Sequence, residues 1–296
     1  MRNDGPFVTM LFIPGSASDK IRRIPELESD AVILDLEDAV AFTAKAAARE
    51  SVADAVRRFG ADHALYVRVN PVESPHFVDD LAAVVGPGPA GINLPKVDSP
   101  ADLLIADRLI THYEAKAGVA AGSVKLMATI ETVVGVANVV DIARATDRLT
   151  TLCFGAGDFS LDIGIDWPDP DGRASAAMDH AKVQLVLACR LAGLQPPHDS
   201  VYSRYGDLDG LRAEAGRSKR LGFLGKHAIH PTQLPVIADV YRPSARQVER
   251  ARGMVDAFGE AEARGEAAVG VAGELVDYPI LYRARQILRI AEASSR

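Results

Sequence analysis

Residues 151–164 read TLCFGAGDFSLDIG, and the rest of the chain is interpreted outward from this stretch. Residues 152–154 are prone to form a β-strand, and the small residues 155–157, GAG, break that strand immediately before Asp158. Small residues let the backbone turn sharply, so they would leave the Asp158 carboxylate exposed at the end of a strand. We therefore expect an acidic side chain at the edge of a sheet.

A second stretch ends in the same way. Residues 125–130, KLMATI, read as a strand, and Glu131 follows them directly. Glu131 and Asp158 are 27 residues apart, which is about the length of one strand–helix unit. Two neighbouring parallel strands would therefore present both carboxylates on one rim, where oxygen ligands suit a hard cation such as Mg²⁺. The alternative is that each acid caps the helix that follows it.

The composition indicates a chain with a large apolar core. Its 296 residues, 48% of them hydrophobic, allow either two domains or one α/β barrel of about 250 residues. The net charge of −7 argues against a nucleic-acid partner, because such partners usually recruit a basic face. Cys153 and Cys189 are too few for a disulfide framework, so we expect a reducing, cytoplasmic environment. We find no signal-peptide pattern and no run of about 18 apolar residues, so we expect no membrane association.

Strand-like and helix-like segments alternate along most of the chain. The strand candidates are residues 9–14, 31–36, 65–69, 90–94, 125–130, 152–154, 199–203 and 225–229. Helix candidates between and after them are residues 20–29, 45–59, 99–116, 132–145, 174–192, 207–221, 244–264 and a last helix to about 293, with an acidic loop at 162–173 and a Gly/Ala-rich link at 265–273. Because eight β–α units imply a closed parallel barrel, we predict an α/β fold, a (β/α)8 TIM barrel, over residues 1–235. Residues 236–296 are predicted to form a C-terminal helical extension or lid.

Nearly every unusual polar residue falls at the C-terminal end of a strand candidate, namely Glu37, Arg68, Lys96, Glu131, Asp158 and His230. In a barrel these strand ends share one mouth, so their coincidence is stronger evidence than any single residue. Asp35, Glu37 and Asp38 near one strand end are costly unless they are paired, hydrated or close to a cation. Arg68 within a strand needs an anionic partner, either Glu37 or Asp38 or a carboxylate or enolate oxygen of a ligand.

The loop after the first strand, residues 15–20, reads GSASDK. Its free backbone N–H groups and the cation of Lys20 favour contact with a phosphate. An ordinary capped turn into the following helix is the alternative, and the sequence leaves both open.

Eight short motifs occur in a fixed order along the chain. They are LFIPG at 11–15, AVILDLEDAV at 31–40, VRVN at 67–70, LPKV at 94–97, IET at 130–132, FGAGD at 154–158, GKHAIHP at 225–231 and VDYP at 276–279. On these motifs the chain resembles the citrate lyase β-subunit-like family, which includes malyl-CoA, citramalyl-CoA and related 3-hydroxyacyl-CoA lyases. Each motif is weak alone, but the ordered set is specific for the family, although not for one substrate. The resemblance covers roughly residues 11–288.

The resemblance implies a Mg²⁺ ion held by Glu131 and Asp158, with Glu131 also close to the substrate. It implies that Arg68 contacts the substrate near the thioester. Glu37 and Asp38 would act in catalysis by holding metal-bound waters.

The resemblance also implies a homotrimer or a hexamer, in which the C-terminal segment reaches over the mouth of a neighbour. The acid of that segment matches Asp277, a candidate for proton transfer in catalysis. Lys20, Ile229 and His230 would lie near coenzyme A. The residues after Gly15 and residues 195–198 depart from the family pattern, so the thioester carrier and the acyl chain stay open.

The leading hypothesis is a Mg²⁺-dependent carbon–carbon lyase. It would cleave a 3-hydroxyacyl-CoA thioester, such as malyl- or citramalyl-CoA, to acetyl-CoA and a 2-oxo acid by a retro-Claisen-type reaction. The alternatives are a citrate lyase β subunit acting on a carrier-protein thioester, a thioester hydrolase, and a Mg²⁺-dependent pyruvate aldolase. A non-catalytic barrel is disfavoured, because Glu131, Asp158 and Arg68 are all present.

Overall fold

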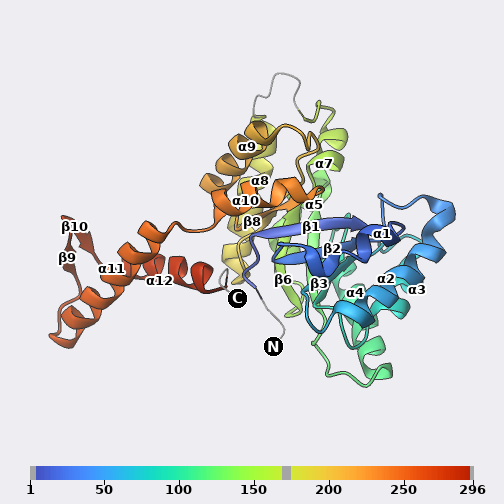
Figure 1. Ribbon diagram of the computed structural model, residues 1–296, viewed down its shortest axis with the longest axis horizontal. Helices are drawn as coiled ribbons and strands as arrows, with labels where there is room; N and C mark the ends of the chain where they lie inside the picture. The colour runs from blue at the N-terminus through green and yellow to red at the C-terminus, as the bar shows by residue number, and fades with distance from the viewer. Residues whose placement is uncertain (1–4, 169–174, 294–296) are drawn as a thin grey trace.

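The computed structural model describes residues 5–168 and 175–293, and its centre is a closed barrel of parallel strands in chain order (Figure 1). The strands are β1 (Thr9–Pro14), β2 (Ala31–Asp35), β3 (Leu65–Arg68), β4 (Gly91–Leu94), β5 (Lys125–Ile130), β6 (Leu149–Phe154), β7 (His198–Asp199) and β8 (Gly225–Ala228). Parallel pairing of β1 with β8 closes the barrel, with Met10 opposite His227. The predicted (β/α)8 barrel is confirmed.

Helices surround the barrel and cover the outer faces of its strands (Figure 1). They are α1 (Ser18–Ile21), α2 (Lys45–Phe59), α3 (Phe77–Val84), α4 (Pro100–Lys116), α5 (Val133–Ala137), α6 (Val139–Ala143), α7 (Ala156–Ile163), α8 (Ala176–Ala192), α9 (Leu208–Leu221) and α10 (Leu234–Tyr241). Side chains alternate along each strand, so Leu11 and Ile13 pack in the large outer core, whereas Met10 packs with the inward-facing side chains. Both faces of the strands are therefore buried, which explains their nearly continuous apolar runs.

Several predicted elements differ from the structure. The helix predicted over residues 132–145 is divided into α5 and α6 at Asn138, and strand β6 begins at Leu149, before the predicted residues 152–154. The helix expected over residues 20–29 ends at Ile21, and the 3₁₀ turn Ile24–Glu26 follows, because Pro25 cannot continue an α-helix. Strand β7 covers only His198–Asp199 instead of residues 199–203. Helix α7 was not predicted; it includes Asp162, at the start of the stretch predicted to be an acidic loop, whose residues 169–174 lie outside the described chain.

The C-terminal segment forms an arm that projects away from the barrel (Figure 1). It consists of α11 (Ala245–Ala263), β9 (Val269–Val271), β10 (Glu274–Val276) and α12 (Tyr278–Ala293), with an apolar cluster of its own around Phe258. The predicted link at 265–273 contains β9, which pairs with β10 across a turn whose Ala272 and Gly273 have positive φ. Because α10 packs against β1 and β8, the boundary predicted after residue 235 falls inside a barrel helix. Within the described residues, we find no helix with the length and apolarity needed to cross a membrane.

Candidate active site

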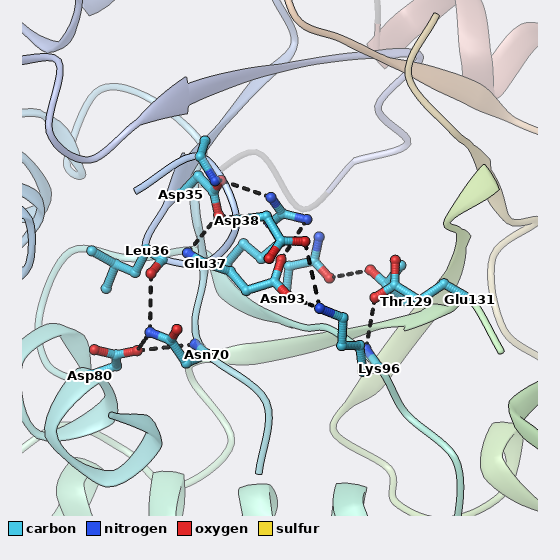
Figure 2. Close-up of polar contacts among 12 residues, drawn as sticks. Asp35, Leu36, Glu37, Asp38, Asn70, Asp80, Asn93, Lys96, Thr129 and Glu131 are labelled. Carbon is cyan, nitrogen blue, oxygen red and sulfur yellow. Dashed lines mark hydrogen bonds and ion pairs between the residues drawn. The ribbon is translucent and has the colours of Figure 1, made fainter. Parts of the chain in front are cut away.

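Five acidic and two basic side chains meet where strands β2 to β6 end, and Figure 2 shows many of them. The members of this cluster, which we call the carboxylate cluster, are Asp35, Glu37, Asp38, Glu131, Asp158, Arg68 and Lys96. They come from consecutive strands of the barrel and the loops that directly follow. Five of the six polar residues predicted to share one mouth therefore gather here, whereas His230 lines a separate groove.

Arg68 is held by two acids at once. Its Nε and Nη2 donate to the two carboxylate oxygens of Asp35, each over 2.7 Å, and its Nη1 lies 2.9 Å from Oε2 of Glu37. Asp35 is fully buried, so this two-point pair is shielded from water. The partner predicted from sequence was Glu37 or Asp38; the structure shows Glu37 together with Asp35. Burial opposes the positive charge, but the bonds to Asp35 and the charge of Glu37 raise the pKa of Arg68 above its ordinary value.

Lys45, a buried residue that was not among the predicted site residues, holds the loop after β2 in place. Lys45 donates from Nζ to the carbonyl oxygens of Leu36 and Glu37 over 2.7 Å and to Oδ1 of Asn70 over 2.8 Å. Asn70 in turn donates to Asp80, as Figure 2 shows. These residues are far apart in sequence and follow no periodicity, so no local signal identifies them.

Lys96 contacts more of the cluster than any other residue described here. Its Nζ lies 2.8 Å from Oε1 of Glu37, 3.5 Å from Asp38 and 3.8 Å from Asp158. Its backbone N–H donates to Oε1 of Glu131 over 2.8 Å. Burial would lower the pKa of Lys96, but the hydrogen bond and charge of Glu37 outweigh it and raise that pKa.

Glu131 is the most strongly perturbed acid of the cluster. Burial, and then the neighbouring charges of Glu37 and Asp158, raise its pKa to about 8, against the opposing effect of Arg68. Gly155 makes room for this carboxylate, because a Cβ at that position would lie 2.5 Å from the Cβ of Glu131. The absence of a side chain at Gly155 therefore leaves space for Glu131, in addition to the backbone freedom expected of a glycine at the predicted strand break.

Asp158 lies in the first turn of α7 and is about one-third exposed. The alternative that both acids cap helices does not describe the structure. The N-cap residues of α5 and α7 are Thr132 and Gly155, and the Thr132 side chain accepts the capping bond from Gly135. Neither Glu131 nor Asp158 is therefore the N-cap residue of the helix that follows it.

An open cleft of about 770 Å³ connects the two predicted metal ligands with solvent. Glu131, Asp158 and Lys96 all line it. Among the described residues, no group of three or more His, Cys, Asp or Glu side chains is arranged to hold a metal ion. Two carboxylates with solvent access fit a Mg²⁺ ion that keeps several waters or substrate oxygens. Burial, and then the charges of Glu37 and Asp158, raise the pKa of Glu131, and a divalent cation at this position would favour the charged carboxylate against both effects.

A second cavity of about 510 Å³ collects the three residues predicted to lie near coenzyme A. Lys20, Ile229 and His230 line this groove between the ends of β1 and β8 and helix α10. Phe12 also lines it, and the centroid of the Phe12 ring lies 4.9 Å from Cζ of Arg68. The groove therefore approaches the carboxylate cluster at Phe12. The side chain of His230 also caps the 3₁₀ turn Pro231–Gln233, where it accepts a hydrogen bond from the backbone N–H of Thr232.

Asp277 is a predicted site residue that lines neither the open cleft nor the groove. It lies in the arm between β10 and α12, where its carboxylate accepts a 3.2 Å hydrogen bond from the backbone N–H of Ile280. Figure 1 shows the arm pointing away from the barrel that carries Arg68.

Comparisons with known proteins agree with this architecture. Residues 8–231 match the family described as HpcH/HpaI aldolase/citrate lyase. The citrate lyase subunit beta of Haemophilus influenzae is 35% identical over 97% of this chain and 98% of its own length. The L-malyl-CoA/beta-methylmalyl-CoA lyase of Cereibacter sphaeroides is 35% identical over 96% of this chain and 94% of its own.

A solved structure extends the likeness to three dimensions. The protein CitE from Mycobacterium tuberculosis, in complex with magnesium, acetoacetate and coenzyme A, superposes with a TM-score of 0.75 at 28% identity. The match covers 98% of this chain and 99% of that chain. The resemblance predicted from the ordered motifs is confirmed: this chain belongs to the HpcH/HpaI aldolase/citrate lyase family.

Proposed function

We propose that this protein is a Mg²⁺-dependent carbon–carbon lyase that cleaves a 3-hydroxyacyl-CoA thioester of the malyl- or citramalyl-CoA type. The observation that carries the proposal is the position of Arg68, which Asp35 and Glu37 fix within electrostatic reach of Glu131, the predicted ligand that itself neighbours Asp158. A positioned cation next to a divalent-metal site is what cleavage to an enolate and a 2-oxo acid requires. Lyases among the relatives support the reaction class.

Glu131 and Asp158 would hold the metal, with Glu37 and Asp38 binding its waters. When bound, Mg²⁺ would acidify the substrate hydroxyl and orient it for cleavage. The released proton passes to a carboxylate of the mouth, and Asp38, 60% exposed, is the one most open to solvent. Breaking the C2–C3 bond then yields the 2-oxo acid and the enolate of the thioester.

Arg68 stabilises the enolate oxygen. Its guanidinium is already oriented by Asp35, so no reorganisation is needed when negative charge develops on the substrate. The enolate carbon then takes a proton to give acetyl-CoA. We assign that proton to Asp277 of a second copy, since the arm carries Asp277 away from its own barrel, and a homotrimer or hexamer would supply the neighbour.

The groove lined by Lys20, Ile229 and His230 would hold the coenzyme A part of the substrate. Lys20 supplies a cation at its rim for a phosphate, and Phe12 leads from the groove to Arg68. The alternative is a citrate lyase β subunit that receives its thioester on a carrier protein. A relative named citrate lyase subunit beta, from Haemophilus influenzae, supports keeping that alternative.

Two measurements test the proposal. Arg68→Lys keeps a positive charge but cannot make the two-point contact with Asp35, so kcat should fall at least about 100-fold while the circular dichroism spectrum is unchanged. An unimpaired kcat would remove Arg68 from the mechanism. Calorimetry with free acetyl-CoA addresses the carrier: binding supports a free thioester, whereas no binding up to millimolar concentrations favours the carrier-protein substrate.

A further inference from the structure

Lys96 contacts, through two different parts of one residue, all four acids that bear on the predicted metal site. The backbone N–H binds Glu131, which is one predicted ligand. The ammonium group lies beside Glu37, Asp38 and the other predicted ligand, Asp158. Figure 2 shows Lys96 between Glu131 on one side and Glu37 and Asp38 on the other.

The backbone of Lys96 adopts a conformation that a lysine rarely takes. Its φ is 52°, in the left-handed region, and within the described chain only Ala272 is another non-glycine residue with positive φ. Ala272 lies in the turn of the β9–β10 hairpin, where such a conformation is common. Lys96 lies in no hairpin, and this conformation directs its backbone N–H to Glu131 while its ammonium group reaches Glu37.

The acids of the carboxylate cluster outnumber its cations. Five acids face two permanent cations, and Arg68 is already committed to Asp35 and Glu37. Lys96 is therefore the other cation of the cluster, and its Nζ lies 3.8 Å from Oδ2 of Asp158. A divalent ion bound by Glu131 and Asp158 would have to share that carboxylate with the ammonium group, and two cations on one carboxylate repel each other.

We propose that Lys96 is a positioning residue whose ammonium group is a placeholder for the divalent cation. It holds Glu37 and Asp158 together while the metal is absent, and it competes with the metal for Asp158. The inference rests on the proposed function, because it takes Glu131 and Asp158 as the metal ligands. Its consequence is that the protein binds Mg²⁺ more weakly, and releases it more easily, than the acids alone would allow.

Mg²⁺ affinity of the purified protein, measured by isothermal titration calorimetry without substrate, is the direct test. Lys96→Met removes the charge at similar length, and we expect the Kd for Mg²⁺ to fall at least about 10-fold. Lys96→Arg keeps the charge and should leave the Kd within about 3-fold of the wild-type value. The backbone N–H that binds Glu131 is present in every variant, so the comparison isolates the ammonium group.

Thermal melting supplies a second readout that a merely structural role would not produce. Without metal, Lys96→Met should melt below the wild type, because Glu37 loses a partner. Saturating Mg²⁺ should then raise the melting temperature of the variant by more than that of the wild type, since tighter binding stabilises more at equal concentration. If Lys96→Met does not fold without metal, Lys96→Gln replaces it, because its amide can still donate to Glu37 but carries no charge.

The outcomes separate the placeholder from the function on which it rests. If the wild type binds Mg²⁺ and the folded neutral variants bind it equally or more weakly, the placeholder role is wrong and the lyase proposal stands. If the wild type itself binds no Mg²⁺, the metal assignment of the proposed function is wrong, and the placeholder role is wrong with it.

Discussion

Asp35 and Arg68 lie opposite each other on β2 and β3, and their side chains make two parallel hydrogen bonds of 2.7 Å. Because Asp35 is fully buried, it supplies charge and orientation to Arg68 while remaining inaccessible to a substrate. The pair therefore links the stability of the barrel to the orientation of the arginine at its mouth.

Asp35→Asn tests this link. The amide cannot compensate the guanidinium charge or accept both hydrogen bonds, so we expect the free energy of unfolding to fall by about 3 kcal/mol and kcat to fall at least about 10-fold. Urea denaturation and steady-state kinetics measure the two effects. As a control, Asp54→Asn removes exposed pairs with Arg57 and Arg58 and should change the free energy of unfolding by less than about 0.5 kcal/mol. Equal effects of the two substitutions would contradict the assigned role of Asp35.

Gly155→Ala should displace Glu131. The new Cβ would overlap the Glu131 side chain, whereas in the matched control Gly157→Ala the nearest atom is a Trp167 ring carbon at 3.6 Å. We expect Gly155→Ala to weaken Mg²⁺ binding at least about 10-fold, because a ligand carboxylate is moved, and Gly157→Ala to leave the affinity within about 2-fold. Calorimetric titration compares them. Undiminished Mg²⁺ affinity in Gly155→Ala would argue against Glu131 as a ligand.

The two histidines inside the barrel make stability depend on pH. His198 and His227 stack with ring centroids 5.7 Å apart, and burial lowers the pKa of His198 to about 4 and that of His227 well below its ordinary value. In the unfolded chain both titrate near 6.5, so below that pH the unfolded state binds more protons than the folded state. Stability is therefore complete above about pH 6.5 and is lost as pH falls toward 4. For His198 alone the loss at pH 5 is about 2 kcal/mol.

Urea denaturation at pH 7.5 and pH 5.0 measures this loss. His198→Gln should reduce the difference between the two values, because one of the titrating groups is removed. His180→Gln, on the exposed surface of α8, is the control and should leave the difference unchanged. An undiminished difference in His198→Gln would show that other groups control the acid sensitivity.

Mixed oligomers test whether Asp277 acts on a neighbour. Arg68→Ala and Asp277→Asn should each be inactive alone. If each site combines Arg68 of one copy with Asp277 of the next, random 1:1 mixing restores about a quarter of all sites, and about a third of the sites in trimers that contain both variants. Co-expression with two tags, purification of the mixed species and an activity assay give the fraction. Inactivity of the mixed species would place Asp277 outside the shared site.

Much of the fold could be predicted because its signals are local. Buried strands such as residues 31–36 are continuous apolar runs, and their regular alternation with helices specifies the barrel. Strand β7 and helix α7 were missed or misplaced, since His198–Asp199 offers only two residues and α7 starts in the glycine-rich stretch that reads as a turn. The helix at Ser18–Ile21 is shorter than predicted because Pro25 cannot continue an α-helix, and this local effect outweighs the helical pattern of residues 20–29.

The candidate site was predictable in its members but not in its pairings. Acids and bases at strand ends identify the mouth, because the barrel brings all such ends together. The pairings depend on strand register and side-chain direction. Examples are the pair of Arg68 with Asp35, the hydrogen bonds of Lys45 to the loop after β2, and the use by Lys96 of its backbone as well as its side chain. None of these leaves a pattern in the order of residues.

The central claim is a Mg²⁺-dependent cleavage of a coenzyme A thioester, and a substrate panel tests it most directly. Purified protein with Mg²⁺ is offered malyl-, citramalyl- and 3-hydroxy-3-methylglutaryl-CoA, and release of glyoxylate, pyruvate or acetoacetate is followed. The account predicts cleavage of at least one thioester, loss of that activity with EDTA, and its recovery with added Mg²⁺. No cleavage of any member by protein that binds Mg²⁺, or cleavage that EDTA leaves intact, would contradict it.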